Sequence, residues 1–412
     1  MAQYRGLTWD HPRGRLALER AAVDATSARG GALIQWDAHP LEGFESAPID
    51  ELAARYDVIV LDHPHLGDAI AADAIRPVDE VFDADLLDAL EAGCVGPSFG
   101  SYVVDGRPWA LPLDAATQVA VFRPDLVEAA PATWPEVVAL AAEAPVALSL
   151  AGPHALLSFA SVCVALGEEP AVLPGAGFVS RATGREAVAL LAELAARSPE
   201  ASASLNPIGL LERMRSVGDI AYIPLVYGYV NYASGPGALR FAEAPSAGPG
   251  GRRGSTIGGT GIAITRRSVP DVALVAHLTQ LFEPATQAGF IPRNAGQPSL
   301  ASAWADDAVN AASGDFYRRT RRTMADAWVR PRVAGYIPFQ SQASAVLREI
   351  LIVGVGAVTS AASVDAALDS IDVLFDSLGE PGRAASVSTG ITPAGINPAG
   401  INPRINPERS RA

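Results

Sequence analysis

The sequence predicts an α/β protein with a parallel sheet, divided between two lobes. Three observations carry this prediction. Apolar strand-like runs alternate with helically spaced segments over the first 64 residues, which is typical of βαβ units. The chain has 412 residues, and a single core stops growing at about 250–300 residues, so two lobes or domains are expected. Hydrophobic residues make up 49% of the chain and charged residues 18%, a composition that suits helices packed on sheets.

The first elements predict where a binding site lies. We expect strands over residues 4–9, 32–36 and 57–64, and helices over 15–28 and 48–56. In a parallel sheet, ligands collect beyond the carboxyl ends of the strands. Polar residues 10–13 and 62–65 follow the first and third of these strands. They are therefore expected to line one edge of a single cleft.

The middle of the chain predicts a crossing between the lobes. Residues 101–127 contain two strands joined by a turn, followed by a long extended run over 109–122. A helix over 133–144 begins with Thr133 as its N-cap and Pro135 in its first turn. A strand over 146–150 and a helix over 154–166 then begin a second α/β unit.

Charge and composition exclude several classes of protein. The formal charge is −14, and the basic residues are all arginines. A chain without lysine has no lysine Schiff base and no P-loop lysine. The acidic balance of the chain argues against a nucleic-acid partner. The uncharged runs at 145–167 and 350–364 are better placed in a core than in a membrane, and Cys94 and Cys163 are expected to be free core thiols.

Six stretches together resemble a known family. They are "TWDHPRG", "YDVIVLDHP", "YVVDGRPWALPLDAATQVAVFRPDLV", "AYIPLVYGYVNYA", "GGTGIAI" and "RPRVAGYIPFQ". Their order over roughly residues 4–378 is similar to that of the extracellular solute-binding proteins of family 1, the sugar-type binding components of ABC importers. The resemblance implies a two-lobed periplasmic-binding-protein-like fold of type 2, which closes around a small-molecule ligand. It also implies ABC permease subunits as partners and no cofactor.

The resemblance implies lobe boundaries as well. The first lobe is expected at 1–112 and 262–305, and the second at 113–258 and 308–378, with hinges near 113–114, 258–261 and after Trp304. Glycines suit a crossing strand, because they allow positive φ and close backbone approach. Residues 380–412 repeat Ile-Asn-Pro and are rich in Gly, Pro and Ser, so they are predicted to be disordered.

Candidate ligand contacts come from the strand ends of the first lobe. Trp9 can stack on a sugar ring or cap the sheet as a core residue. Asp10 and Arg13 can hydrogen-bond ligand hydroxyls or a carboxylate, or form an internal Asp–Arg pair. The sequence Asp-His-Pro occurs twice, and its polar members are Asp10, His11, Asp62 and His63.

The second lobe contributes further candidates. Tyr227 and Tyr229 share one face if their stretch is extended, and they offer stacking and hydroxyl groups, or pack in the core. Asn231 follows them, and Asp114 either contacts the ligand or fixes the hinge. The lesser candidates, which are more often surface or lobe-packing residues, are Gln297, Arg330 and Gln340.

An enzyme on the same scaffold is the alternative function. Its acid–base residues are then Asp10, His11, Asp62 and His63. The sequence has no HEXXH motif and no paired CxxC, so no metal is expected. The N-terminus lacks a signal-peptide pattern, which predicts a cytoplasmic protein, or an exported one if a leader is missing. A cytoplasmic sensor or carrier is the third possibility.

Overall fold

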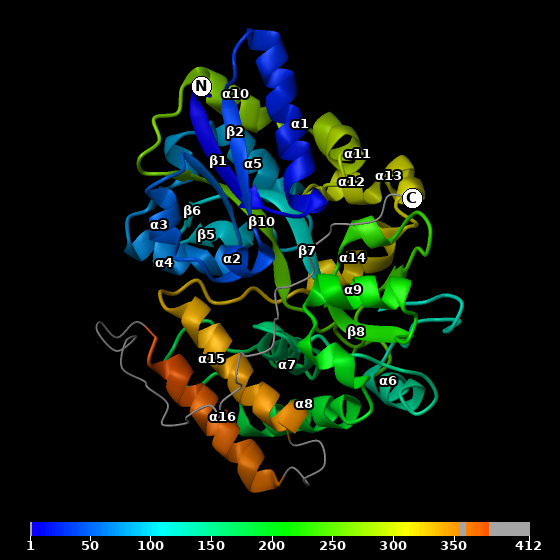
Figure 1. Cartoon of the computed structure of the whole chain (residues 1–412). Coiled ribbons are helices and arrows are strands. Elements are labelled where there is room, and N and C mark those ends of the chain that lie inside the picture. The colour runs from blue at the N-terminus through cyan, green and yellow to red at the C-terminus, as the bar shows by residue number, and fades with distance from the viewer. Residues whose placement is uncertain (1, 354–359, 379–412) are drawn as a thin grey trace, which may run out of the picture. The chain divides into compact units, whose positions relative to one another are not determined.

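A large mixed sheet with helices packed on it organises the chain (Figure 1). The structure is a computed structural model, which describes residues 2–353 and 360–378. The strand order is β2-β1-β3-β10-β7-β8, with β4 paired to β10 and β9 paired to β7. These strands are β1 (Tyr4–Trp9), β2 (Ile34–His39), β3 (Val58–Leu61), β4 (Ile75–Arg76), β7 (Leu111–Phe122), β8 (Tyr222–Tyr227), β9 (Arg240–Ala242) and β10 (Ile257–Thr265).

The first three strands form the parallel part of the sheet. β1 pairs in parallel with β2 and with β3. Every residue of β3 is buried, which agrees with its uniformly apolar sequence. The carboxyl ends of β1 and β3 therefore lie at the same edge of the sheet, as the βαβ pattern predicts.

Two long strands connect the two halves of the fold. β7 has 12 residues, all of them buried. Its first half pairs with β10, and its second half pairs with β8 and β9. β10 in turn pairs with β3 and β4 of the first half. β7 and β10 are thus shared by both halves, and Figure 1 shows them running between the upper and lower parts of the molecule.

The glycines of β10 make room for two tyrosine rings. A Cβ at Gly258 would lie 2.6 Å from the ring of Tyr227, and one at Gly261 would lie 2.7 Å from the ring of Tyr102. Gly259 has a φ of +94°, and the register with β7 shifts between Thr260 and Gly261. These close approaches and the positive φ explain why this crossing strand is rich in glycine.

Helices cover the sheet and build most of the second half. The ring of Phe178 lies 5.1 Å from that of Phe375 and 5.4 Å from that of Phe339, which ties α16 and α15 together. The helices are α1 (Pro12–Arg29), α2 (Leu41–Ser46), α3 (Ile49–Ala53), α4 (Leu66–Ala71), α5 (Ala84–Gly93), α6 (Trp134–Leu140), α7 (His154–Ala165), α8 (Arg181–Ala195), α9 (Pro207–Ser216), α10 (Val272–Gln280), α11 (Ile291–Arg293), α12 (Ala301–Ala305), α13 (Asp307–Ala312), α14 (Phe316–Asp326), α15 (Tyr336–Arg348) and α16 (Ala361–Asp376).

Most of the predicted elements are present, with one correction. The two strands with a turn are β5 (Val103–Val104) and β6 (Arg107–Pro108), and Thr133 begins α6 with a complete capping box. The strand predicted over 146–150 is wrong, because only Val146 forms a bridge, to Tyr222. The predicted disordered tail at 380–412 lies outside the described residues, as do residues 354–359 of the uncharged run at 350–364.

Two further expectations concern single residues and membrane spans. Cys94 and Cys163 are free thiols, and Cys163 is buried, whereas Cys94 is only partly so. Within residues 2–353 and 360–378, no helix combines the length and the apolar character that crossing a membrane requires.

Candidate functional site

Two groups of polar and aromatic side chains lie where the first half of the fold meets the second. The first, the Trp9 group, consists of Trp9, His11, Arg13, Asp114 and Tyr229. The Trp9 and His11 rings are stacked, with centroids 5.2 Å apart and planes 7° apart. The Tyr229 ring stands edge-on to both, at 6.1 Å from Trp9 and 5.0 Å from His11. This packing joins β1 to the loop that follows β8.

Arg13 forms the centre of the Trp9 group. Its Nε and Nη2 donate to the two carboxylate oxygens of Asp114 at 2.6 and 2.5 Å, and its Nη1 donates to the Gly228 carbonyl at 3.1 Å. The Arg13 and Asp114 side chains are only 4% and 5% exposed. Burial by itself lowers the pKa of the Arg13 guanidinium, but Asp114 outweighs this and raises it above its ordinary value.

The local sequence builds this arrangement. His11 is the N-cap of α1, and its Nδ1 accepts a hydrogen bond from the Arg13 backbone N–H at 3.1 Å, with Pro12 in the first turn. A Cβ at position 14 would lie 2.2 Å from the indole nitrogen of Trp9, so Gly14 lets that ring pack against the first turn. Burial, and then the charge of Arg13, lower the pKa of His11 to about 4.

Asp10 takes no part in the Trp9 group. It pairs with Arg15 at 2.5 Å, and its side chain is 58% exposed. Asp10 and Arg13 therefore do not pair with each other. Asp10 pairs with Arg15 of the same stretch, and Arg13 pairs with Asp114 of β7.

The second group, the Arg330 group, consists of Asp62, His63, Arg330, Tyr336 and Gln340. Arg330 Nη2 donates to Asp62 Oδ2 at 2.5 Å, and Nη1 donates to Gln340 Oε1 at 3.1 Å. Burial by itself raises the pKa of the Asp62 carboxyl, but the charge of Arg330 outweighs it and holds this pKa below its ordinary range. Burial, and then Arg330, lower the pKa of His63 to about 4. This group links the end of β3 to the segment before α15.

Tyr227 lies beside the Arg330 group rather than beside Tyr229. Its ring is edge-on to His154, the first residue of α7, at 5.9 Å. β8 ends at Tyr227, so the chain is not one extended strand through Tyr229. The two tyrosines consequently pack against different neighbours, contrary to the shared face that an extended stretch predicts.

Polar residues after β8 tie this loop to the first half. Asn231 donates from Nδ2 to the Ala295 carbonyl at 3.1 Å. Gln297 accepts from the Val230 N–H at 2.8 Å and donates to the Ala115 carbonyl at 3.0 Å. Asn231 and Gln297 therefore connect chain segments in the described conformation.

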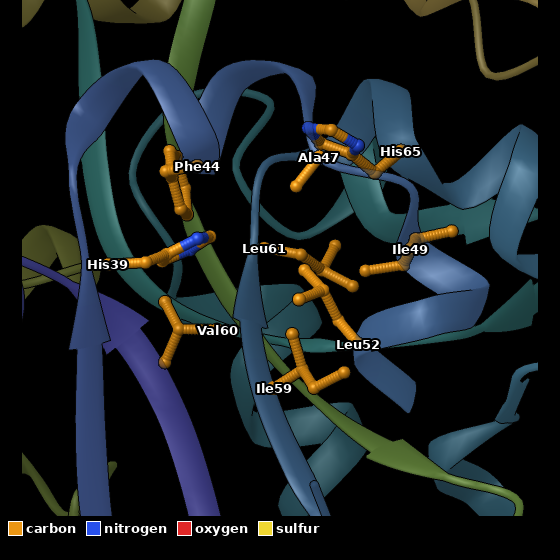
Figure 2. Close-up of a pocket in the computed structure, with 9 residues that line it drawn as sticks. All are labelled: His39, Phe44, Ala47, Ile49, Leu52, Ile59, Val60, Leu61 and His65. Atoms are coloured by element: carbon orange, nitrogen blue, oxygen red, sulfur yellow. The ribbon is translucent and has the colours of Figure 1, made fainter. Parts of the chain in front are cut away.

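Two cavities lie apart from these contacts. One of about 10 Å³ lies beyond β2 and β3, with His39 and His65 among its nine lining residues (Figure 2). That volume is room for about one water molecule. A cavity of about 250 Å³ in the second half is lined by parts of 148–150, 195–203 and 351–352, and it shares no residue with either group.

Several of the predicted site residues therefore fall into two contact groups, which lie beyond the carboxyl ends of β1 and β3 at one edge of the sheet, and Asp10 belongs to neither group. Sequence reasoning missed Tyr336, His154 beside Tyr227, and Tyr102, whose ring stands edge-on to His63 at 6.2 Å. The spacing Arg-Pro-Arg at 330–332 and the Tyr336 beside it are signals that the quoted stretch "RPRVAGYIPFQ" contains. In the part of the chain that the structure describes, no three His, Cys, Asp or Glu side chains are grouped as a metal site requires.

Comparisons with known proteins show the fold. No protein-family model and no curated protein matches the chain. A maltose-bound MalE3 of T. maritima matches with a TM-score of 0.73 and 19% identity, over 90% of this chain and 99% of that chain. A ribitol-bound ABC transporter solute-binding protein of Agrobacterium radiobacter has the same TM-score and identity, over 90% of this chain and 98% of that chain.

A third solved structure is more distant in sequence. UgpB of Mycobacterium tuberculosis, in complex with glycerophosphocholine, matches with a TM-score of 0.68 and 15% identity, over 91% of this chain and 99% of that chain. All three matches extend over nearly the whole of the other protein. The chain has the two-lobed α/β fold of the periplasmic binding proteins.

Proposed function

We propose that the protein is a solute-binding protein of the ABC-importer type, which closes two lobes around a small polar ligand such as a sugar, a polyol or a related organic acid. One observation carries the proposal. The fold matches solute-binding proteins over 97–99% of the length of the chains compared. Those chains include proteins bound to maltose, ribitol and D-mannitol.

The lobes of this proposal are residues 1–112 with 262–305, and 113–258 with 308–378. The sharing of β7 and β10 by both halves supports this division, because two strands that cross between lobes can bend while each lobe stays rigid. The pair of Asp62 and Arg330 joins the two lobes. So does the hydrogen bond from Arg13 to the Gly228 carbonyl.

The ligand contacts of this proposal lie around the Arg330 group, with Tyr227 as a stacking surface. Tyr227 is partly exposed, whereas Trp9 and Tyr229 are only 3% and 4% exposed and already pack on each other. Arg13 and Asp114 form an ion pair with each other, so neither charge is available to a ligand. The Trp9 group accordingly holds the crossing region in shape, and the partly exposed Tyr227 and Asp62 are the side chains that face the ligand.

The geometry around the four candidate acid–base residues favours binding over catalysis. A general base works best with a pKa near the working pH, whereas the pKa values of His11 and His63 are both lowered to about 4. Asp10 is exposed and paired with Arg15. Each of these residues therefore has a contact role that needs no proton transfer.

Thermal shift followed by small-angle scattering tests the proposal. Maltose, ribitol, D-mannitol and glycerophosphocholine are screened for an increase in melting temperature, and the radius of gyration is then measured with and without any stabilising compound. We expect one class to stabilise the protein and to reduce its radius, because a ligand that touches both lobes favours the closed state. Stabilisation without a change in radius refutes the clamp, and product formation in the same samples favours an enzyme.

A further inference from the structure

We infer that the ligand carries an anionic group, a carboxylate or a phosphate, and that Arg332 binds this group beside the Arg330 group. The inference rests on the proposed function, since it names the ligand class of the same site. It depends on the charges, burial and contacts of the segment between α14 and α15.

Arg332 has no counter-ion in the described part of the chain. It is partly buried, yet it forms no hydrogen bond and no ion pair with a described residue. Burial lowers the pKa of its guanidinium, and no carboxylate acts against that effect. Arg330, two residues away, differs because Asp62 is bound to it and holds its pKa above the ordinary value. Arg332 thus adds a positive charge that nothing nearby neutralises.

The two arginines lie toward the same end of β3. Residues 329–332 are neither helix nor strand, and Pro331 favours an extended conformation for the residue before it. Alternate residues of an extended chain share a side. Arg330 bonds Asp62 at the end of β3, and Val333, the residue after Arg332, contacts Gly67, so the chain on both sides of Arg332 lies against this end of the strand.

The following residues fix this segment against the first half of the fold. A Cβ at Gly67 would lie 2.3 Å from the Val333 carbonyl carbon, so the two backbones are in direct contact. The Gly335 N–H donates to Asp68 Oδ1 at 2.7 Å. Figure 1 shows the segment before α15 passing between the upper and lower parts of the molecule. The backbone that follows Arg332 is therefore held against the first half of the fold.

Buried polar atoms of the Arg330 group also lack partners. Among the described residues, none bonds to Arg330 Nε, the Tyr336 hydroxyl or His63 Nε2, although these side chains are only 3%, 0% and 0% exposed. Buried polar groups in proteins are almost always hydrogen-bonded, and leaving one unpaired is costly. A ligand oxygen that accepts hydrogen bonds from Arg330 Nε and the Tyr336 hydroxyl removes that cost.

An anion suits this junction better than a neutral ligand. Asp62 is paired with Arg330 and Asp68 accepts the Gly335 N–H, which leaves Arg332 as the cation of this segment without a paired carboxylate among the described residues. A neutral sugar offers this partly buried guanidinium no counter-charge, whereas a carboxylate or phosphate forms charge-assisted, bidentate hydrogen bonds with it. The formal charge of the chain is −14, so the protein as a whole repels anions. Binding of an anionic ligand therefore depends on the local positive charge of Arg332.

Simple anions test the inference without knowledge of the ligand. The melting temperature is measured with inorganic phosphate, acetate and chloride at equal ionic strength, on the wild type, Arg332→Gln, Arg332→Lys and Arg319→Gln. Arg319 is an exposed arginine of α14 and serves as the matched control. We expect phosphate or acetate to stabilise the wild type and Arg319→Gln more than chloride does. Arg332→Gln should lose that difference, and Arg332→Lys should keep part of it.

The arms of the experiment separate the possible outcomes. A response to acetate alone indicates a carboxylate ligand, and a response to phosphate alone indicates a phosphate. General salt stabilisation affects all variants equally, so an equal response of Arg332→Gln overturns the inference. A neutral sugar that compacts the wild type and Arg332→Gln with the same affinity also overturns it, while the solute-binding function stands. If no compound reduces the radius of gyration of the wild type, the proposed function is refuted instead, whether or not phosphate or acetate raises the melting temperature.

Discussion

Removing the carboxylate of Asp114 provides a strong test of the Trp9 group. The substitution Asp114→Ala leaves the Arg13 guanidinium buried without its counter-ion, with two of its three hydrogen bonds lost. Breaking a buried ion pair from one side costs about 3–5 kcal/mol. Because both side chains are at most 5% exposed, solvent cannot replace the missing partner. We expect the free energy of unfolding to fall by about this amount.

The matched control is an Arg–Asp pair of the same geometry at the surface. Arg185 donates from Nε and Nη2 to the carboxylate of Asp365 at 2.7 and 2.6 Å, with side chains 53% and 31% exposed. Asp365→Ala is expected to change stability little, because water takes over the exposed guanidinium. Urea unfolding, followed by circular dichroism and fluorescence, measures both variants.

A double variant tests whether the lost stability comes from the buried, unpaired charge of Arg13 or only from the lost hydrogen bonds. Arg13→Met combined with Asp114→Leu removes both charges and retains apolar volume, so it should recover most of the stability lost in Asp114→Ala. If Asp114→Ala is no more harmful than Asp365→Ala, the account of a desolvated pair in the Trp9 group is wrong.

Three further predictions concern the junction and the crossing strand. Asp62→Ala removes the counter-ion that ties the end of β3 to the segment before α15, so the unliganded radius of gyration should increase; an unchanged radius means that the pair is not a tie. The free energy of unfolding should fall as the pH drops from 6.5 to about 4. Over this range His63 gains a proton in the unfolded chain but stays neutral in the native protein, where its pKa is lowered to about 4. Urea unfolding at several pH values should show that the unfolding free energy of His63→Asn depends less steeply on pH than that of the wild type. Equal slopes contradict the assignment of this dependence to His63. Gly258→Ala brings a Cβ within 2.6 Å of the Tyr227 ring and should cost about 1–3 kcal/mol, whereas Gly100→Ala, with open space around it, should be nearly neutral in the same unfolding assay.

Local sequence patterns predicted most of the elements but not their long-range contacts. The alternation of strands and helices in the first 64 residues corresponds to β1, α1, β2, α3 and β3. Thr133 was recognisable as an N-cap because capping depends on a few adjacent residues. The apolar run at 146–150 has strand-like composition, but strand formation requires a neighbour along its full length, and only Val146 has one.

The candidate site was predicted in part. The polar ends of β1 and β3 do meet the second half of the fold, as the parallel sheet suggests. Local pattern does not reveal that Arg13 pairs with Asp114, 101 residues away, or that Asp62 pairs with Arg330, 268 residues away. Such pairings depend on the packed fold, so the division into two groups emerged only from the structure.

The cap at the start of α1 determines which nitrogen of His11 carries a proton. Because Nδ1 accepts the Arg13 backbone N–H, the neutral ring must be the Nε2–H tautomer. A proton added at Nδ1 cannot coexist with this hydrogen bond. Strong acid therefore removes the cap from the turn that carries Arg13, and the helix that holds the crossing region loosens at its first residue. Nitrogen NMR of the imidazole distinguishes the two tautomers and shows the pH at which Nδ1 gains its proton and the cap is lost.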